Sequence, residues 1–78
     1  MMRIDHEPDT IFAWIELEPS PHLHSLPVGK HVIAYDDASN VTGIEVLDTR
    51  EFGEPFDRAA AHRAVTWARE QLTARDVR

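Results

Sequence analysis

Cysteine is absent from this 78-residue chain, which excludes disulfide bonds and thiolate metal ligands. Long apolar runs are absent as well: the longest, Ile11–Ile15, is far below the roughly 20 residues that cross a bilayer. The sequence therefore predicts no membrane span. The N-terminal residues Met1–Asp5 lead into polar residues without the apolar stretch of a secretion signal. Together these absences predict a cytoplasmic protein.

Glycine is scarce, and the three glycines are too widely separated for a phosphate-binding loop: Gly29, Gly43 and Gly53. No serine lies in the pattern of a nucleophile elbow. A pair of the carboxylates near the second hairpin could serve as general acid and base only if one were buried beside an apolar group: Asp36, Asp37, Glu45 and Asp48. The run Asp36–Asn40 is better explained as a turn whose side chains bond the local backbone. The sequence predicts a protein that is not an enzyme and needs no cofactor.

Positive charge is rare in most of the chain. Residues 1–56 contain three basic and eleven acidic residues, a net charge of −8, whereas residues 57–78 carry a net charge of +2. An acidic surface repels nucleic-acid phosphates and attracts a basic protein or a cation. The same charge could serve solubility alone. Nucleic-acid binding through the arginines of the last third is the weaker hypothesis.

β-Branched and aromatic residues predict four strands, at residues 2–6, 10–17, 30–35 and 41–47. A fifth short strand at residues 22–26 is compatible with the pattern. Gly43, inside the last strand, indicates a bulge or a close backbone approach. In residues 56–74, apolar residues recur every three or four positions, which is typical of a helix buried on one side.

These patterns predict one α+β domain, residues 1–78. A small antiparallel β-meander of four to five strands (1–48) is joined by a connection (49–55) to one C-terminal α-helix (56–74), which packs against it.

The alternation of side chains along a strand places apolar residues on both faces of the predicted sheet. Ile11, Ala13 and Ile15 face one side, whereas Phe12 and Trp14 face the other. One helix covers only one face, so the second face should pack against another molecule. Because chains this small usually need extra stabilisation, we predict a homodimer. Trp14 has two interpretations: core packing beneath the helix, or an interface anchor.

The candidate partner surface combines aromatic and acidic side chains that would bind a basic protein: Phe12, Trp14, Tyr35, Asp36, Asp37 and Glu45. The alternative is a metal- or small-ligand-binding protein that uses His22 and His24 together with nearby carboxylates or His31. The histidine spacing matches neither a zinc finger nor the His-Glu-x-x-His helix.

Two stretches resemble a family of small prokaryotic proteins known as domain of unknown function 2283. Val28–Asp36 and Val41–Asp48 are similar to that family's Gly-Val-x-x-Asp and Val-x-Gly-Ile-Glu-Ile-Leu strands, and Asp9–Ile15 is similar to its Asp-Ala-Leu-Tyr-Ile stretch. The similarity covers about residues 4–48; Trp14 stands where a polar residue is usual there. The resemblance implies a small sheet-based domain without an established activity, and an antitoxin-like partner of a small basic toxin.

Overall fold

The computed structural model describes residues 2–17 and 22–76. It contains one five-stranded antiparallel sheet, a short 3₁₀ helix η1 (Thr49–Glu51) and one α-helix, α1 (Arg58–Asp76). The strands are β1 (Met2–His6), β2 (Ala13–Leu17), β3 (His24–Val28), β4 (His31–Tyr35) and β5 (Val41–Val46). The predicted α+β class is confirmed. Within the described residues, no helix is long and apolar enough to span a membrane.

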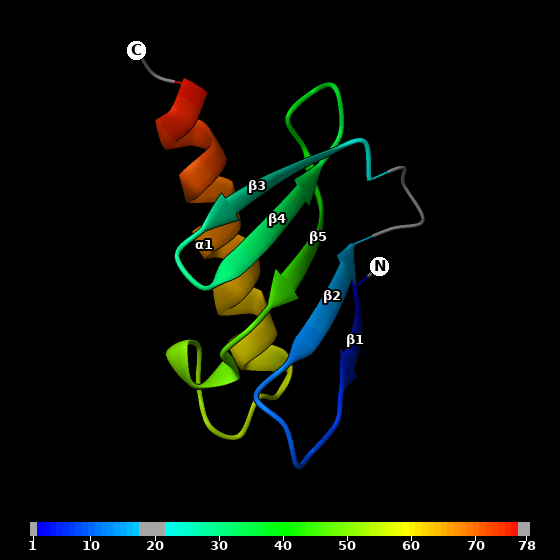
Figure 1. Ribbon diagram of the computed structural model, residues 1–78, viewed down its shortest axis with the longest axis vertical. Helices are drawn as coiled ribbons and strands as arrows, with labels where there is room; N and C mark the ends of the chain where they lie inside the picture. The colour runs from blue at the N-terminus through cyan, green and yellow to red at the C-terminus, as the bar shows by residue number, and fades with distance from the viewer. Residues whose placement is uncertain (1, 18–21, 77–78) are drawn as a thin grey trace.

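The strand order in space is β1-β2-β5-β4-β3. Strands β3, β4 and β5 form a meander, and the hairpin of β1 and β2 joins it beside β5 (Figure 1). The last strand in sequence is therefore the central strand of the sheet, a neighbour relation that the sequence patterns do not specify. Helix α1 crosses behind the sheet and covers one face (Figure 1). We call the other face the open face.

A row of three isoleucines forms the centre of the core. Ile15, Ile44 and Ile33 pair with one another across β2, β5 and β4, and each is 0% exposed. Helix α1 covers this row with small, buried side chains, which let its backbone approach the sheet closely: Ala60, Ala61, Ala64 and Ala68.

Helix α1 begins at Arg58, two residues later than the sequence pattern suggests, and extends to Asp76. The Asp57 side chain accepts a hydrogen bond from the Ala60 backbone N–H (3.0 Å), so Asp57 is the N-cap. Phe56 lies before the cap and is still buried in the core, which explains why the apolar periodicity starts before the helix does.

The bulge expected near Gly43 is present. Ala34 pairs with Gly43, but the next residue of β4 pairs with Val41, so Thr42 has no partner in the register. The extra residue reverses the alternation: Val41 belongs to the core under α1, and the Thr42 hydroxyl is hydrogen-bonded to His22 Nδ1 (2.8 Å).

Asp48, at the N-cap of η1, is a buried carboxylate in an ion-pair network. The Arg50 guanidinium donates to both of its carboxylate oxygens (2.9 Å each), the Arg50 backbone N–H donates at 3.1 Å, and Lys30 Nζ lies 3.4 Å away. The Arg50 side-chain hydrogen bonds hold the pKa of Asp48 well below its usual range.

Acidification should therefore destabilise the protein partly through Asp48. Because the folded-state pKa is depressed, Asp48 contributes stability above its unfolded pKa of about 3.9, and this contribution is lost as the pH falls through the folded pKa. We expect the free energy of unfolding, measured with urea, to fall less between pH 7 and pH 2 in Asp48→Asn than in the wild type. The exposed Asp9→Asn is the matched control, and identical acid profiles for both variants would contradict the prediction.

Candidate functional site

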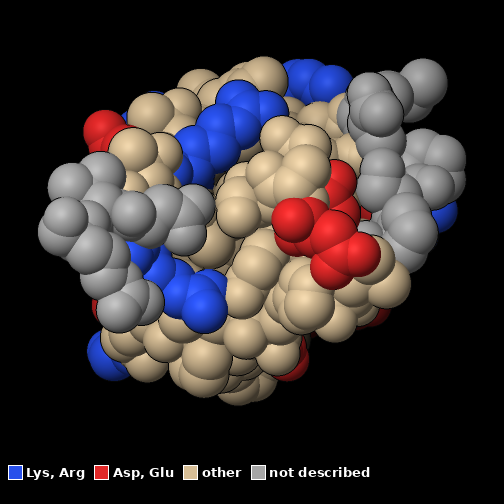
Figure 2. All heavy atoms as spheres, turned by 90° about the horizontal axis from the view of Figure 1, so that it is seen from above, with Lys and Arg blue, Asp and Glu red and all other residues tan. Residues whose placement is uncertain are grey.

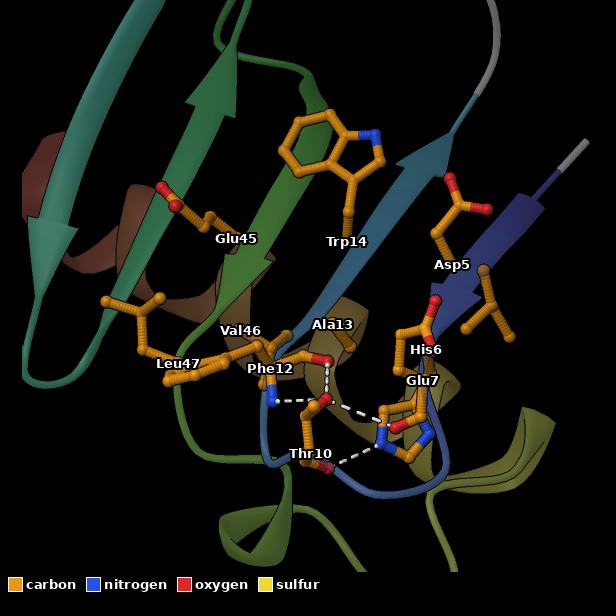
Figure 3. A pocket seen from close by; sticks show the side chains of 11 residues that line it. Asp5, His6, Glu7, Thr10, Phe12, Ala13, Trp14, Glu45, Val46 and Leu47 are labelled. Carbon is orange, nitrogen blue, oxygen red and sulfur yellow. Dashed lines mark hydrogen bonds between the residues drawn. The ribbon is translucent and has the colours of Figure 1, made fainter.

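The open face carries a shallow hollow of about 790 Å³ beside the β1–β2 hairpin. Figure 3 shows Glu45 and Leu47 on its β5 side, and Trp14 and the other residues of the β1–β2 hairpin on the opposite side. Its wall combines exposed apolar side chains with three carboxylates: Asp5, Glu7 and Glu45. No lysine or arginine is among the described residues that line it.

Trp14 lies on the open face, so its interpretation as core packing beneath the helix is wrong. The indole lies over Gly43, where a Cβ atom would be 2.7 Å from Trp14 Cζ2 and closer still to Cη2. Its Nε1–H donates a long hydrogen bond to Glu16 Oε1 (3.4 Å), and the His22 ring contacts it edge-on at a centroid distance of 5.3 Å. The glycine beneath and these two neighbours fix the ring in place.

Phe12 and Leu47 supply the exposed apolar surface of the hollow, at 57% and 37% exposure. Phe12 precedes β2 in the hairpin loop. That loop is ordered by Thr10, whose hydroxyl donates to the Glu7 carbonyl (3.1 Å), and by His6, whose Nε2–H donates to the Thr10 carbonyl (3.0 Å; Figure 3). Two large apolar side chains therefore remain accessible on an ordered support, as at binding surfaces.

The carboxylates of the hollow are incompletely neutralised. Asp5 lies 3.8 Å from Arg3, but both side chains are mostly exposed, so this ion pair contributes little. Glu45 has no ion-pair partner within the described part of the chain. The hollow is therefore a negatively charged, aromatic surface.

The structure brings together half of the predicted partner-binding residues. Phe12, Trp14 and Glu45 line the hollow. The Tyr35 hydroxyl accepts a hydrogen bond from Arg75 of α1, on the covered side of the sheet.

The other two predicted residues, Asp36 and Asp37, lie in the β4–β5 loop. Asp36 Oδ1 accepts from the backbone N–H groups of Ala38 and Asn40 (2.9 Å each), and the Asn40 bond is the main cause of its lowered pKa. These contacts make Asp36 a turn-forming residue, as the sequence indicates. Asp37 Oδ1 lies 2.6 Å from His24 Nε2.

Charge is segregated at this end of the molecule. Figure 2 looks onto the end that is at the top of Figure 1. The largest group of acidic atoms lies on one side of this end and several basic side chains lie across from it, while smaller numbers of both kinds appear elsewhere in the view. Four of the exposed arginines belong to α1: Arg58, Arg63, Arg69 and Arg75. The charge asymmetry of the sequence thus becomes a division between sheet and helix.

The histidines of the alternative hypothesis do not converge. His22 contacts Thr42 and Trp14, whereas His24 contacts Asp37 and Tyr35. His31 is 2% exposed beneath α1; its Nδ1 accepts from the Leu47 backbone N–H (3.2 Å), and its Nε2 is hydrogen-bonded to Glu51 (2.8 Å). Among the residues that the structure describes, no three His, Asp or Glu side chains are grouped to hold a metal ion.

Sequence reasoning did not identify Asp5, Glu7 and Leu47 as parts of the hollow. Asp5 pairs with Trp14, and Trp14 pairs with Glu45. Alternation along β1 places Asp5 on the same face as Arg3, but only the register against β2 shows that it lies beside Trp14.

Comparisons of the chain with protein-family models, with curated proteins and with solved structures found no match.

Proposed function

We propose that this chain is a non-enzymatic, cytoplasmic interaction module that binds a basic protein through the hollow on the open face. One observation supports it: the exposed Phe12 and Leu47 and the half-buried Trp14 line one hollow together with Asp5 and Glu45 on the sheet face that α1 leaves uncovered. Aromatic side chains are frequent energetic centres of interfaces. Carboxylates around them accelerate association with a positively charged partner and favour it over an acidic one.

An antitoxin-like role, with a small basic toxin as the partner, is the specific form of this proposal. It rests on the resemblance of residues 4–48 to domain of unknown function 2283, and it stays a prediction. The charge of the hollow is consistent with such a partner, because its described lining contains carboxylates and no lysine or arginine.

The expected homodimer also stays a prediction, and it requires a surface other than the hollow. In a two-fold symmetric contact the same patch meets itself, so the carboxylates of the two hollows would face each other. Among the described strands, β1 is at one edge of the sheet and has β2 as its single neighbour. This edge is the surface through which we expect two copies to associate.

The test is affinity capture from the native host with the tagged chain and matched charge reversals. We expect a small basic protein to be recovered by the wild type and by Glu70→Lys, an exposed glutamate on α1, but to be reduced at least tenfold by Glu45→Lys. Trp14→Ala should weaken the purified complex by roughly 30-fold or more, as expected for an aromatic anchor. Light scattering of the complex gives its stoichiometry. Equal recovery by both charge reversals would refute the proposed surface.

A further inference from the structure

An acidic, an aromatic and a second acidic side chain lie in one cross-strand row on the open face. Asp5 of β1 pairs with Trp14 of β2, and Trp14 pairs with Glu45 of β5. Directly paired residues in antiparallel strands have Cβ atoms about 4.5–5.5 Å apart, so Asp5 and Glu45 flank Trp14 in this row. Figure 3 shows Glu45 and Asp5 on opposite sides of Trp14, with the hollow below.

The indole of Trp14 is prearranged for a ligand. Gly43 lets the ring lie against the backbone of β5, since any larger residue would collide with it. Glu16 accepts from its Nε1–H, and His22 packs edge-on against it. A ring that is already fixed loses little conformational entropy on binding. The entropy cost that would otherwise offset its favourable contacts with a ligand is therefore small.

The group that suits this row is a planar cation. A guanidinium group can stack on an indole face and donate two parallel hydrogen bonds to one carboxylate, whereas an ammonium group is a strongly hydrated point charge without a plane. Glu45 is available for such a bond because it has no ion-pair partner within the described residues. The remaining carboxylates of the hollow, Asp5 and Glu7, add to the negative potential.

We propose that the hollow binds an arginine side chain of the partner, with the guanidinium stacked on Trp14 and hydrogen-bonded to Glu45. This inference rests on the proposed function and specifies it: the partner is recognised through an exposed arginine, and lysine is a poorer substitute. Phe12 and Leu47 then contact the apolar residues that flank this arginine.

The experiment is an NMR titration of the ¹⁵N-labelled chain with three probes: N-acetyl-arginine amide, N-acetyl-lysine amide and the uncharged N-acetyl-citrulline amide. Concentrations up to roughly 50 mM at low salt are needed, because one stacked cation binds weakly. The two tryptophan indole N–H signals are assigned with Trp67→Phe, and Trp67 is an internal reference because it packs against His31 and Phe52.

We expect the arginine probe to shift the Trp14 indole signal in a saturable manner and to leave Trp67 unchanged. The lysine shift should be smaller, and citrulline should cause none. Glu45→Gln should reduce the arginine affinity at least threefold, whereas the matched Glu70→Gln should not. Equal shifts with arginine and citrulline, or no shift of Trp14, would overturn the inference. If the captured partner still depends on Glu45 in that case, the interaction proposal stands and only the arginine assignment fails; if neither depends on Glu45, both fail.

Discussion

Replacing Ile44 with alanine is expected to lower the free energy of unfolding by about 2–5 kcal/mol. Ile44 is 0% exposed at the middle of the central strand, between Ile15 and Ile33, and α1 covers this row. The truncation removes buried apolar surface and leaves a cavity that the neighbouring strands cannot fill. A 78-residue chain has a total stability of about 4–12 kcal/mol, so this loss is a large fraction.

Thermal unfolding followed by circular dichroism, together with urea unfolding, measures this effect. A loss of this size should lower the melting temperature by at least about 10 °C in a domain of this length. Leu23→Ala is the matched control, because Leu23 is 53% exposed and its truncation should change the stability by less than about 0.5 kcal/mol. Similar losses in the two variants would contradict the placement of Ile44 at the centre of the core.

Replacing Gly43 with alanine is expected to displace the Trp14 ring and to destabilise the chain by about 1–3 kcal/mol. The new Cβ would collide with Cη2 and Cζ2 of Trp14 and would also lie 3.2 Å from the Ile15 carbonyl oxygen. The ring must then rotate away from β5 and lose its contacts with Glu16 and His22. Fluorescence of Trp14 in a Trp67→Phe background reports the displacement, and urea unfolding gives the cost.

A double-mutant cycle separates this collision from a general effect on the strand. In the Trp14→Ala background the colliding ring is absent and only the 3.2 Å contact with the Ile15 carbonyl oxygen remains, so Gly43→Ala should cost less stability than in the wild type, by at least about 1 kcal/mol. Additive effects of the two substitutions would contradict the close approach of ring and backbone. The same cycle, repeated with the arginine probe, should show that Gly43→Ala weakens binding only where Trp14 is present.

The bulge and the hollow have a common origin in the sequence around Gly43. The glycine leaves room for the indole, and the extra residue Thr42 turns its hydroxyl toward His22, whose ring packs edge-on against the indole. One irregularity in β5 thus holds the central side chain of the proposed site. Bulges next to functional sites commonly re-aim side chains in this way.

Local patterns in the sequence determine much of this protein. Period-two and three-to-four-residue apolar patterns specify the strands and α1, because burial of one face imposes those periods. The turn at residues 36–40 and the irregularity at Gly43 follow from the backbone preferences of their residues. The division of charge between the sheet and the helix also follows directly from the sequence.

Only the tertiary structure decides which strands are neighbours, and with it the composition of the site. Alternation assigns Trp14 and Glu45 to faces of their own strands, but it does not show that β5 lies beside β2 or that Asp5 pairs with Trp14. For the same reason, local patterns did not show that Tyr35, Asp36 and Asp37 lie outside the hollow, although their side chains are of the same aromatic and acidic types as those that line it. Local propensity acts within a strand, whereas strand order and register depend on packing between residues that are far apart in the sequence.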